Sequence, residues 1–309
     1  MFKIKLFLSQ FIPIKSLRRQ IKANLLWREE HPKVGKFLDE KYILSFIQGA
    51  LPNFEFKPKA NFKDDKIIWQ LWYQGEQNAP ELVKMCLSSV KKHMGQEYQV
   101  IVLDENLIKH YLDFPPFIWQ KIENKAFGEK TISIFSDLLR VALLATYGGV
   151  WLDASIFLSD KIPDKLLQKD FFVFQRSLIV PENHKEWTTF DYRYFVWDEN
   201  FRAKFFSAFI ISKSNYPLIN ALKDILMNFW QNENSLPHYF IFNFIFDSLI
   251  QNEPYKSLNC EITNDTDIHL LQLYVKKGLL NEKTWQEIKQ KSFLHKLNTH
   301  LNGLNLNFL

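Results

Sequence analysis

The feature that most constrains the fold of this chain is a helical pattern that passes directly into a short apolar strand. Thr131–Tyr147 has the apolar spacing of a largely buried helix, and Gly148 and Gly149 follow it. Glycine often ends a helix because it tolerates a left-handed backbone. The apolar segment Val150–Leu152 comes next and is expected to form a strand, with Asp153 at its carboxyl end. This order predicts that one face of the helix and Asp153 share a pocket.

Strand and helix patterns alternate along much of the chain. Ile67–Trp72 and Tyr98–Leu103 are expected to be buried strands, and a helix that begins near Pro80 lies between them. Further helices are expected at residues 105–112, 116–126, 217–230, 237–250 and 268–277, and further strands at 171–175 and 205–212. The alternation predicts an α/β fold with a mostly parallel central sheet flanked by helices. Ligands of such sheets bind beyond the carboxyl ends of the strands, where Trp72 and Asp104 lie.

Residues 1–60 are expected to form a basic helical N-terminal extension, and residues 61–309 a single domain. Short helices are expected in the extension, for example Ile14–Trp27 and Phe37–Ile47. The first 36 residues hold nine Lys or Arg and two Glu, although the net charge of the whole chain is only +5. This segment suits an anionic membrane surface, and a solvated basic helix packed on the domain is the alternative. Nucleic acid is not an expected partner, because the rest of the chain is slightly acidic.

Several common kinds of site are excluded by the sequence. The nine glycines form neither G-x-G-x-x-G nor a P-loop, and H-E-x-x-H and G-x-S-x-G are absent. Cys86 and Cys260 cannot make a disulfide framework, which fits a reducing, cytoplasmic compartment. Lys3 and Lys5 interrupt the first apolar run, so this run is not expected to act as a signal peptide. The kind of site that is not excluded is one that uses carboxylates and binds a diphosphate.

Three side chains of the central segment have that chemistry. Asp137 and Arg140 are three residues apart, so they lie on one face of the predicted helix, and Asp153 can reach the same pocket. Carboxylates can hold hydroxyl groups or a divalent ion, and a guanidinium can bind phosphate. The simpler interpretations are a surface ion pair between Asp137 and Arg140 and an ordinary turn residue at Asp153.

The segment S-D-L-L-R-x-x-L-L-x-x-Y-G-G-V-W-L-D-A-S, residues 136–155, resembles the bacterial capsular polysaccharide synthesis glycosyltransferases, relatives of glycosyltransferase family 32. The resemblance includes I-I-W-Q-L-W-Y-Q-G at residues 67–75 and covers most of residues 66–300, whereas the first 60 residues match only loosely. It implies a GT-A fold and a nucleotide-sugar donor, a UDP-sugar rather than a GDP-sugar. It also implies a divalent metal, Mn²⁺ or Mg²⁺.

The same resemblance implies roles for individual residues. Trp72 would stack on the nucleobase, and Asp104 would lie on the nucleotide side of the site. Asp137 and Arg140 would hold the donor sugar's hydroxyls and diphosphate, and Asp153 would be the first acid of the DXD motif. These last three are the implied catalytic residues. For Trp69, core packing is expected rather than stacking on the base.

The second acid of the DXD motif is replaced by Ser155 in this chain, which affects the implied metal site. Asp153, Ser155 and His295 are the metal ligands that the resemblance suggests, with His300 as an alternative to His295. A hydroxyl is a weaker ligand than a carboxylate, so either a lower metal affinity is expected or a metal held mainly by Asp153, phosphate and water. Lys296 could meet phosphate.

The resemblance implies a hexosyltransferase-type glycosyltransferase that acts on a capsular or lipopolysaccharide-type glycan or glycolipid and retains anomeric configuration. It would be cytoplasmic and could bind the inner face of the membrane through residues 1–36. The alternative is a non-catalytic sugar-nucleotide-binding or membrane-associated scaffold protein of the same fold. Phe240–Phe246 is expected to be core. Acceptor-side candidates are His238, Tyr239, Asp247, and Asp191, Asp198 and Glu199 in a loop expected to cover the site.

Overall fold

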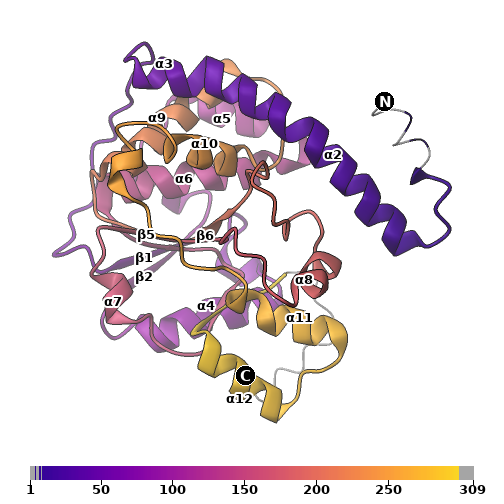
Figure 1. Cartoon of the computed structure of the whole chain (residues 1–309). Coiled ribbons are helices and arrows are strands. Elements are labelled where there is room, and N and C mark those ends of the chain that lie inside the picture. The colour runs from indigo at the N-terminus through magenta and orange to yellow at the C-terminus, as the bar shows by residue number, and fades with distance from the viewer. Residues whose placement is uncertain (1–3, 5–6, 8, 299–309) are drawn as a thin grey trace.

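A computed structural model describes residue 4, residue 7 and residues 9–298 (Figure 1). Its centre is a five-stranded sheet in the order β2-β1-β3-β6-β5. The strands are β1 (Ile67–Leu71), β2 (Gln99–Leu103), β3 (Gly149–Leu152), β5 (Phe171–Gln175) and β6 (Phe205–Ser212). β1 is parallel to both β2 and β3, and β6 runs antiparallel to β3 and β5. The predicted α/β fold with a mostly parallel sheet is confirmed, and β6 is the reversed strand that makes the sheet mixed.

Helices cover both faces of the sheet (Figure 1). α6, α9 and α10 lie on one face, and α4, α11 and α12 lie on the side of the other. The helices are α2 (Lys15–Leu38), α3 (Leu44–Ile47), α4 (Glu81–Met94), α5 (Pro116–Glu123), α6 (Thr131–Tyr147), α7 (Asp164–Leu167), α8 (His184–Phe190), α9 (Pro217–Asn232), α10 (Ile241–Leu249), α11 (Leu270–Lys277) and α12 (Glu282–Lys291). The helix predicted at residues 105–112 is instead a 3₁₀ turn, Leu107–His110.

The core beneath α6 follows from the pairing of neighbouring strands. Trp69 pairs with Trp151, so both indoles leave the same face of the sheet, and both are fully buried. The indole N–H of Trp69 donates to the Gly148 carbonyl at 3.0 Å, which satisfies its polar atom. Trp69 is therefore a core residue, as expected. The aromatic segment Phe240–Phe246 is also core, because Phe242, Phe244 and Phe246 are buried in α10.

The N-terminal segment is more continuous than its sequence suggests. The predicted helical N-terminal extension is confirmed, but its two short helices are parts of one longer run. α2 continues unbroken through Pro32 and passes by a π-helical turn, η1 (Asp39–Ile43), into α3. Leu38 and Tyr42 are buried in the core that also contains α6 and α9. This burial outweighs the one backbone hydrogen bond that a proline removes from a helix. The domain boundary at residue 60 stays a prediction.

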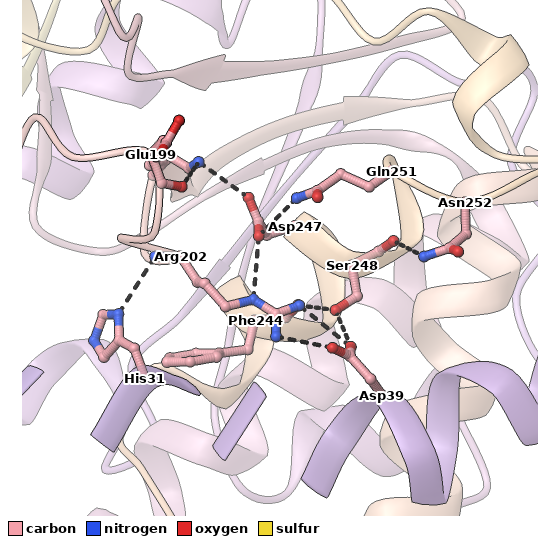
Figure 2. A network of polar contacts seen from close by, with 10 residues as sticks. His31, Asp39, Glu199, Arg202, Phe244, Asp247, Ser248, Gln251 and Asn252 are labelled. Atoms are coloured by element: carbon pink, nitrogen blue, oxygen red, sulfur yellow. Dashed lines mark hydrogen bonds and ion pairs between the residues drawn. The ribbon is translucent and has the colours of Figure 1, made fainter. Parts of the chain in front are cut away.

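A polar network joins this N-terminal segment to the rest of the chain (Figure 2). Arg202 lies in the loop before β6, and its guanidinium contacts Asp39 of η1 at 3.1 Å and Asp247 of α10 at 3.2 Å. The backbone N–H of Arg202 donates to His31 Nδ1 of α2 at 3.3 Å. Arg202 thus connects three segments that are far apart in the sequence: α2 with η1, the loop before β6, and α10.

A small second sheet was not expected from the sequence. β4 (Ile156–Leu158) pairs antiparallel with β7 (Leu294–Lys296), and the register places Lys296 opposite Ile156. Because β4 begins directly after Ser155, the C-terminal segment comes back to the end of β3. Within the described residues, no helix combines the length and the apolar character needed to cross a bilayer.

Candidate active site

Arg140 is the centre of the candidate site and is almost fully buried in α6. Its Nη2 lies 3.1 Å from Oδ1 of Asp137 and 3.4 Å from Oδ1 of Asp153. Its Nη1 donates to the Ser207 carbonyl at 2.5 Å, and its Nε donates to the Ser136 carbonyl at 3.1 Å. The guanidinium also lies over the Trp151 ring, 5.1 Å from its centroid. Arg140 is therefore held rigidly and fixes two carboxylates at once.

Asp153 reaches Arg140 because of the turn that precedes β3. Gly148 and Gly149 both have positive φ, 73° and 96°, and a Cβ on Gly149 would clash with the Ile67 carbonyl of β1. The turn thus lets β3 enter the sheet directly beneath the end of α6. The Trp151 indole, two residues earlier on the same face of the strand, donates to Asp153 Oδ1 at 2.9 Å. This second contact was not predicted, although the two-residue spacing of Trp151 and Asp153 along an extended segment is a signal for it.

The two carboxylates differ in their protonation. Burial raises the pKa of Asp137 to about 7, with Asp153 adding to the rise and Arg140 opposing it. Burial also pushes the pKa of Asp153 upward, but Arg140, Lys296 and the Trp151 indole outweigh it, so the pKa of Asp153 lies below its usual range. At neutral pH Asp153 is the charged partner, and Asp137 can exchange a proton. The side chains of Asp137 and Asp153 are 15 % and 25 % exposed, so both reach solvent.

Lys296 of β7 completes the group from the C-terminal segment. Its ammonium donates to Ser155 Oγ at 2.7 Å and to Asp153 Oδ2 at 3.2 Å. The β4–β7 pairing explains this position, because Lys296 lies opposite Ile156, the neighbour of Ser155. Asp137, Arg140, Asp153, Ser155 and Lys296 therefore form one connected cluster, which we call the acidic–basic cluster.

The suggested metal ligands do not come together. His295 is fully buried on the opposite side of β7 from Lys296, where its Nε2 lies 2.8 Å from Ser159 Oγ. It is wrong as a partner of Asp153, because consecutive residues of a strand point to opposite faces. Asp153 and Ser155 are both bonded to the Lys296 ammonium. In the described part of the chain, no group of three or more His, Cys, Asp or Glu side chains could hold a metal ion. Among the residues that the structure describes, Asp153 and Ser155 therefore do not make a complete ligand set for a divalent ion. His300 lies outside the described residues.

The two nucleotide-side candidates lie at the carboxyl ends of β1 and β2, as expected. Trp72 is half-buried and packs near Val83, Leu87 and Ala154, and its indole N–H has no hydrogen-bond partner among the described residues. Asp104 has a local role, because its Oδ1 accepts the backbone N–H groups of Asn106 and Leu107. The stacking role of Trp72 and the nucleotide role of Asp104 stay predictions.

Of the acceptor-side candidates, Tyr239 is the one that the structure places near the acidic–basic cluster. Burial is the main cause that raises the pKa of the Tyr239 phenol. The carboxylates of Asp137 and Asp153 raise it further and Arg140 opposes them, so the phenol interacts electrostatically with all three groups. Tyr239 is 46 % exposed, so a ligand can reach it.

The other acceptor-side candidates are engaged elsewhere. Asp247 contacts Arg202 at 3.2 Å and Lys204 at 3.5 Å in the network of Figure 2. His238 packs against His31, with ring centroids 5.1 Å apart. The backbone carbonyl of Glu199 accepts from Lys204 in the same network. Asp191 and Asp198 accept backbone N–H groups two residues further along their loops. These contacts explain the positions of these residues without a ligand.

Comparison with known proteins gives a consistent set of relatives. The chain is 31 % identical over 106 residues to "O-glycosyltransferase braB" of Annulohypoxylon truncatum, covering 32 % of this chain and 25 % of the relative. It is 24 % identical over 176 residues to "O-glycosyltransferase PaGT" of Phomopsis amygdali, covering 55 % and 40 %. It is 30 % identical over 132 residues to "Glycosyltransferase afumC" of Aspergillus fumigatus, covering 40 % and 31 %. The chain thus spans only 25 % to 40 % of the length of these curated relatives.

A solved structure described as "PaToxG Glycosyltransferase" aligns with 87 % of this chain and 99 % of that chain, at 16 % identity and a TM-score of 0.39. The family described as "Capsular polysaccharide synthesis protein" matches residues 21–307. This match includes most of the N-terminal segment as well as the acidic–basic cluster. Because it covers nearly the whole chain, the protein belongs to the capsular polysaccharide synthesis family.

Proposed function

We propose that the protein is a glycosyltransferase that moves a sugar from a nucleotide donor to a hydroxyl group of a glycan or glycolipid acceptor. The observation that carries the proposal is the convergence of Asp137 and Asp153 on Arg140, next to the Lys296 ammonium. Paired carboxylates can orient sugar hydroxyls, and fixed positive charges can stabilise a departing diphosphate. The names of the curated relatives, two of which are O-glycosyltransferases, support transfer to oxygen.

Asp137 and Arg140 have distinct parts in this proposal. Asp137 would accept a hydrogen bond from a donor-sugar hydroxyl. Arg140 would hold Asp137 and Asp153 in place through its two ion pairs. Because the guanidinium is buried and already bonded, we propose that Arg140 acts by positioning these carboxylates. A UDP-sugar, a capsular or lipopolysaccharide-type acceptor and retention of configuration are further parts of the proposal.

The experiment is nucleotide release from a panel of UDP- and GDP-sugars, with a mixture of glycan acceptors. The full chain should release nucleotide from at least one donor, and Asp153→Asn should lower that rate by at least about 100-fold, since an electrostatic contact at the reacting groups is lost. The exposed Asp160→Asn is the matched control and should act as the unchanged chain does. Uptake of a sugar nucleotide without any consumption would instead support a binding or scaffold protein.

We propose further that the N-terminal segment binds an anionic membrane surface in the cytoplasm. Phe7, Phe11 and Ile14 are 57 %, 69 % and 59 % exposed, and the start of α2 projects beyond the rest of the chain (Figure 1). Exposed apolar side chains beside Arg18 and Lys22 are typical of interfacial segments. Sedimentation with vesicles should show binding when anionic lipid is present, and deletion of residues 1–14 should abolish it. Equal binding of the deleted chain would contradict this part.

A further inference from the structure

The Lys296 ammonium lies where a metal-dependent transferase would need its ion. Two of the three residues suggested as metal ligands, Asp153 and Ser155, instead accept hydrogen bonds from Lys296 Nζ, at 3.2 Å and 2.7 Å. The third, His295, faces away from them. A divalent ion bound by Asp153 Oδ2 and Ser155 Oγ would have to displace the ammonium from both atoms. The chain thus supplies a positive charge of its own at this point.

We propose that Lys296 is a catalytic residue that binds the donor diphosphate and stabilises it as it leaves, so that transfer proceeds without a divalent ion. The inference rests on the proposed glycosyltransferase function and specifies how the same site handles the diphosphate charge. An ammonium carries three hydrogen-bond donors. Two of them meet Asp153 and Ser155, and no acceptor among the described residues takes the third, which can therefore be donated to a phosphate oxygen. The side chain is 24 % exposed, which gives the diphosphate access to it.

The groups around Lys296 leave an excess of positive charge at this position, and the local pairing restricts its movement. Cys86 and His269 lie within its electrostatic reach, and burial keeps both neutral near pH 7, raising the pKa of Cys86 to about 12 and lowering that of His269 to about 3. Asp153 is the anion that Lys296 meets, and it is shared with Arg140. Asp137 also pairs with Arg140, and because its pKa is about 7 it is only partly ionised near neutral pH. The two cations therefore outweigh the two carboxylates, and the remaining positive charge attracts a diphosphate. The β4–β7 pairing restricts how far Lys296 can move.

The chemical step needs no further reactant. The bond between the anomeric carbon and the diphosphate oxygen breaks, and its electron pair stays on that oxygen. The acceptor hydroxyl oxygen forms the new bond to the anomeric carbon, and its proton passes to the departing phosphate. Lys296 donates a hydrogen bond to the diphosphate throughout, and this bond strengthens as negative charge develops on the leaving oxygen.

The test measures binding of UDP and GDP by calorimetry in EDTA and in Mn²⁺, with nucleotide release under the same conditions. The full chain should bind one of the two nucleotides with a Kd in EDTA within about twofold of its Kd in Mn²⁺, and its turnover should persist in EDTA. Lys296→Met should weaken binding in EDTA by about tenfold or more, as expected for the loss of a charged contact. Lys296→Arg should recover part of the affinity. Lys289→Met, which removes a lysine of α12, is the matched control and should bind as the unchanged chain does.

Binding and turnover of the full chain that disappear in EDTA and return with Mn²⁺ would overturn the inference and leave the glycosyltransferase proposal standing. Unchanged binding by a folded Lys296→Met chain would also overturn it. If Lys296→Met does not fold, the EDTA comparison on the full chain still decides. A full chain that binds neither nucleotide in either condition would overturn the proposed function and this inference together.

Discussion

Arg140 Nη2 lies 3.4 Å from Asp153 Oδ1, across the junction between α6 and the end of β3. The two residues are separated by the Gly148-Gly149 turn, which folds the chain back on itself. The guanidinium is 5 % exposed and also pairs with Asp137. The buried guanidinium therefore stabilises the fold, and it also fixes the positions of the two carboxylates that share it.

Replacement of Arg140 by methionine should therefore destabilise the fold. Arg140→Met leaves Asp137 and Asp153 without their shared cation, and the loss of one partner of a buried ion pair costs about 3 kcal/mol in free energy of unfolding. Urea denaturation would measure this change. Arg28→Met removes an exposed arginine that lies 3.8 Å from Asp198, so it should change the free energy of unfolding by less than about 0.5 kcal/mol. Equal effects of the two substitutions would contradict the structural role of Arg140.

Asp137 makes stability depend on pH in a specific window. Its pKa is about 7 in the folded chain and 3.8 in the reference state, so between these values the folded chain binds more protons than the unfolded one. The free energy of unfolding attributable to this group therefore falls as the pH rises from about 4 to about 7. Asp137→Asn removes the titration, so it should be more favourable to stability at pH 8 than at pH 5. Urea midpoints of both chains at the two pH values would measure this, and an effect independent of pH would contradict it.

The sequence predicts the parts of this fold that have long, regular patterns. The helix Thr131–Tyr147 is found with the predicted bounds, and β5 and β6 also match their predicted ranges. Each has a continuous apolar signal, because it is buried on most sides. Asp137, Arg140 and Asp153 are in contact as the local spacing suggested, since one turn separates the helix from the strand.

The parts that the sequence could not predict depend on contacts between distant segments. β4 and β7 have three residues each, which is too short for a periodic signal, and their pairing decides that Lys296 faces Asp153 while His295 faces away. α12 (Glu282–Lys291) is mostly polar, with only Trp285 and Ile288 buried, so it resembles a loop in the sequence. The continuity of α2 through Pro32 depends on tertiary burial, which a local rule on proline cannot contain.

The turn between α6 and β3 should tolerate no side chain at its second glycine. Gly149→Ala combines a φ of 96° with a clash against the Ile67 carbonyl, so we expect a loss of about 3 kcal/mol or more in free energy of unfolding. Gly278→Ala is the matched control, because its φ is 68° and nothing lies within 4 Å of the added Cβ. It carries backbone strain without a clash and should cost about 1 kcal/mol. Urea denaturation of both variants would separate the cost of backbone strain from the cost of the steric clash. Similar losses in free energy of unfolding would contradict the close approach of β3 to β1.

Arg202 should control how firmly the N-terminal segment is attached. Its guanidinium meets Asp39 at 3.1 Å and Asp247 at 3.2 Å, so Arg202→Met removes the link that joins η1 to α10 (Figure 2). We expect a loss of about 2 kcal/mol, from charge-assisted hydrogen bonds at partly buried groups. The loss should be local, because the polar partners of the Arg202 side chain in the described structure lie in η1 and α10. Hydrogen exchange followed by mass spectrometry should show faster exchange in residues 31–47 and unchanged exchange in α6. Arg193→Met, at an arginine that is 72 % exposed, should change neither region. Faster exchange spread over the whole chain would mean that this network stabilises the complete fold rather than the attachment of its N-terminal helices.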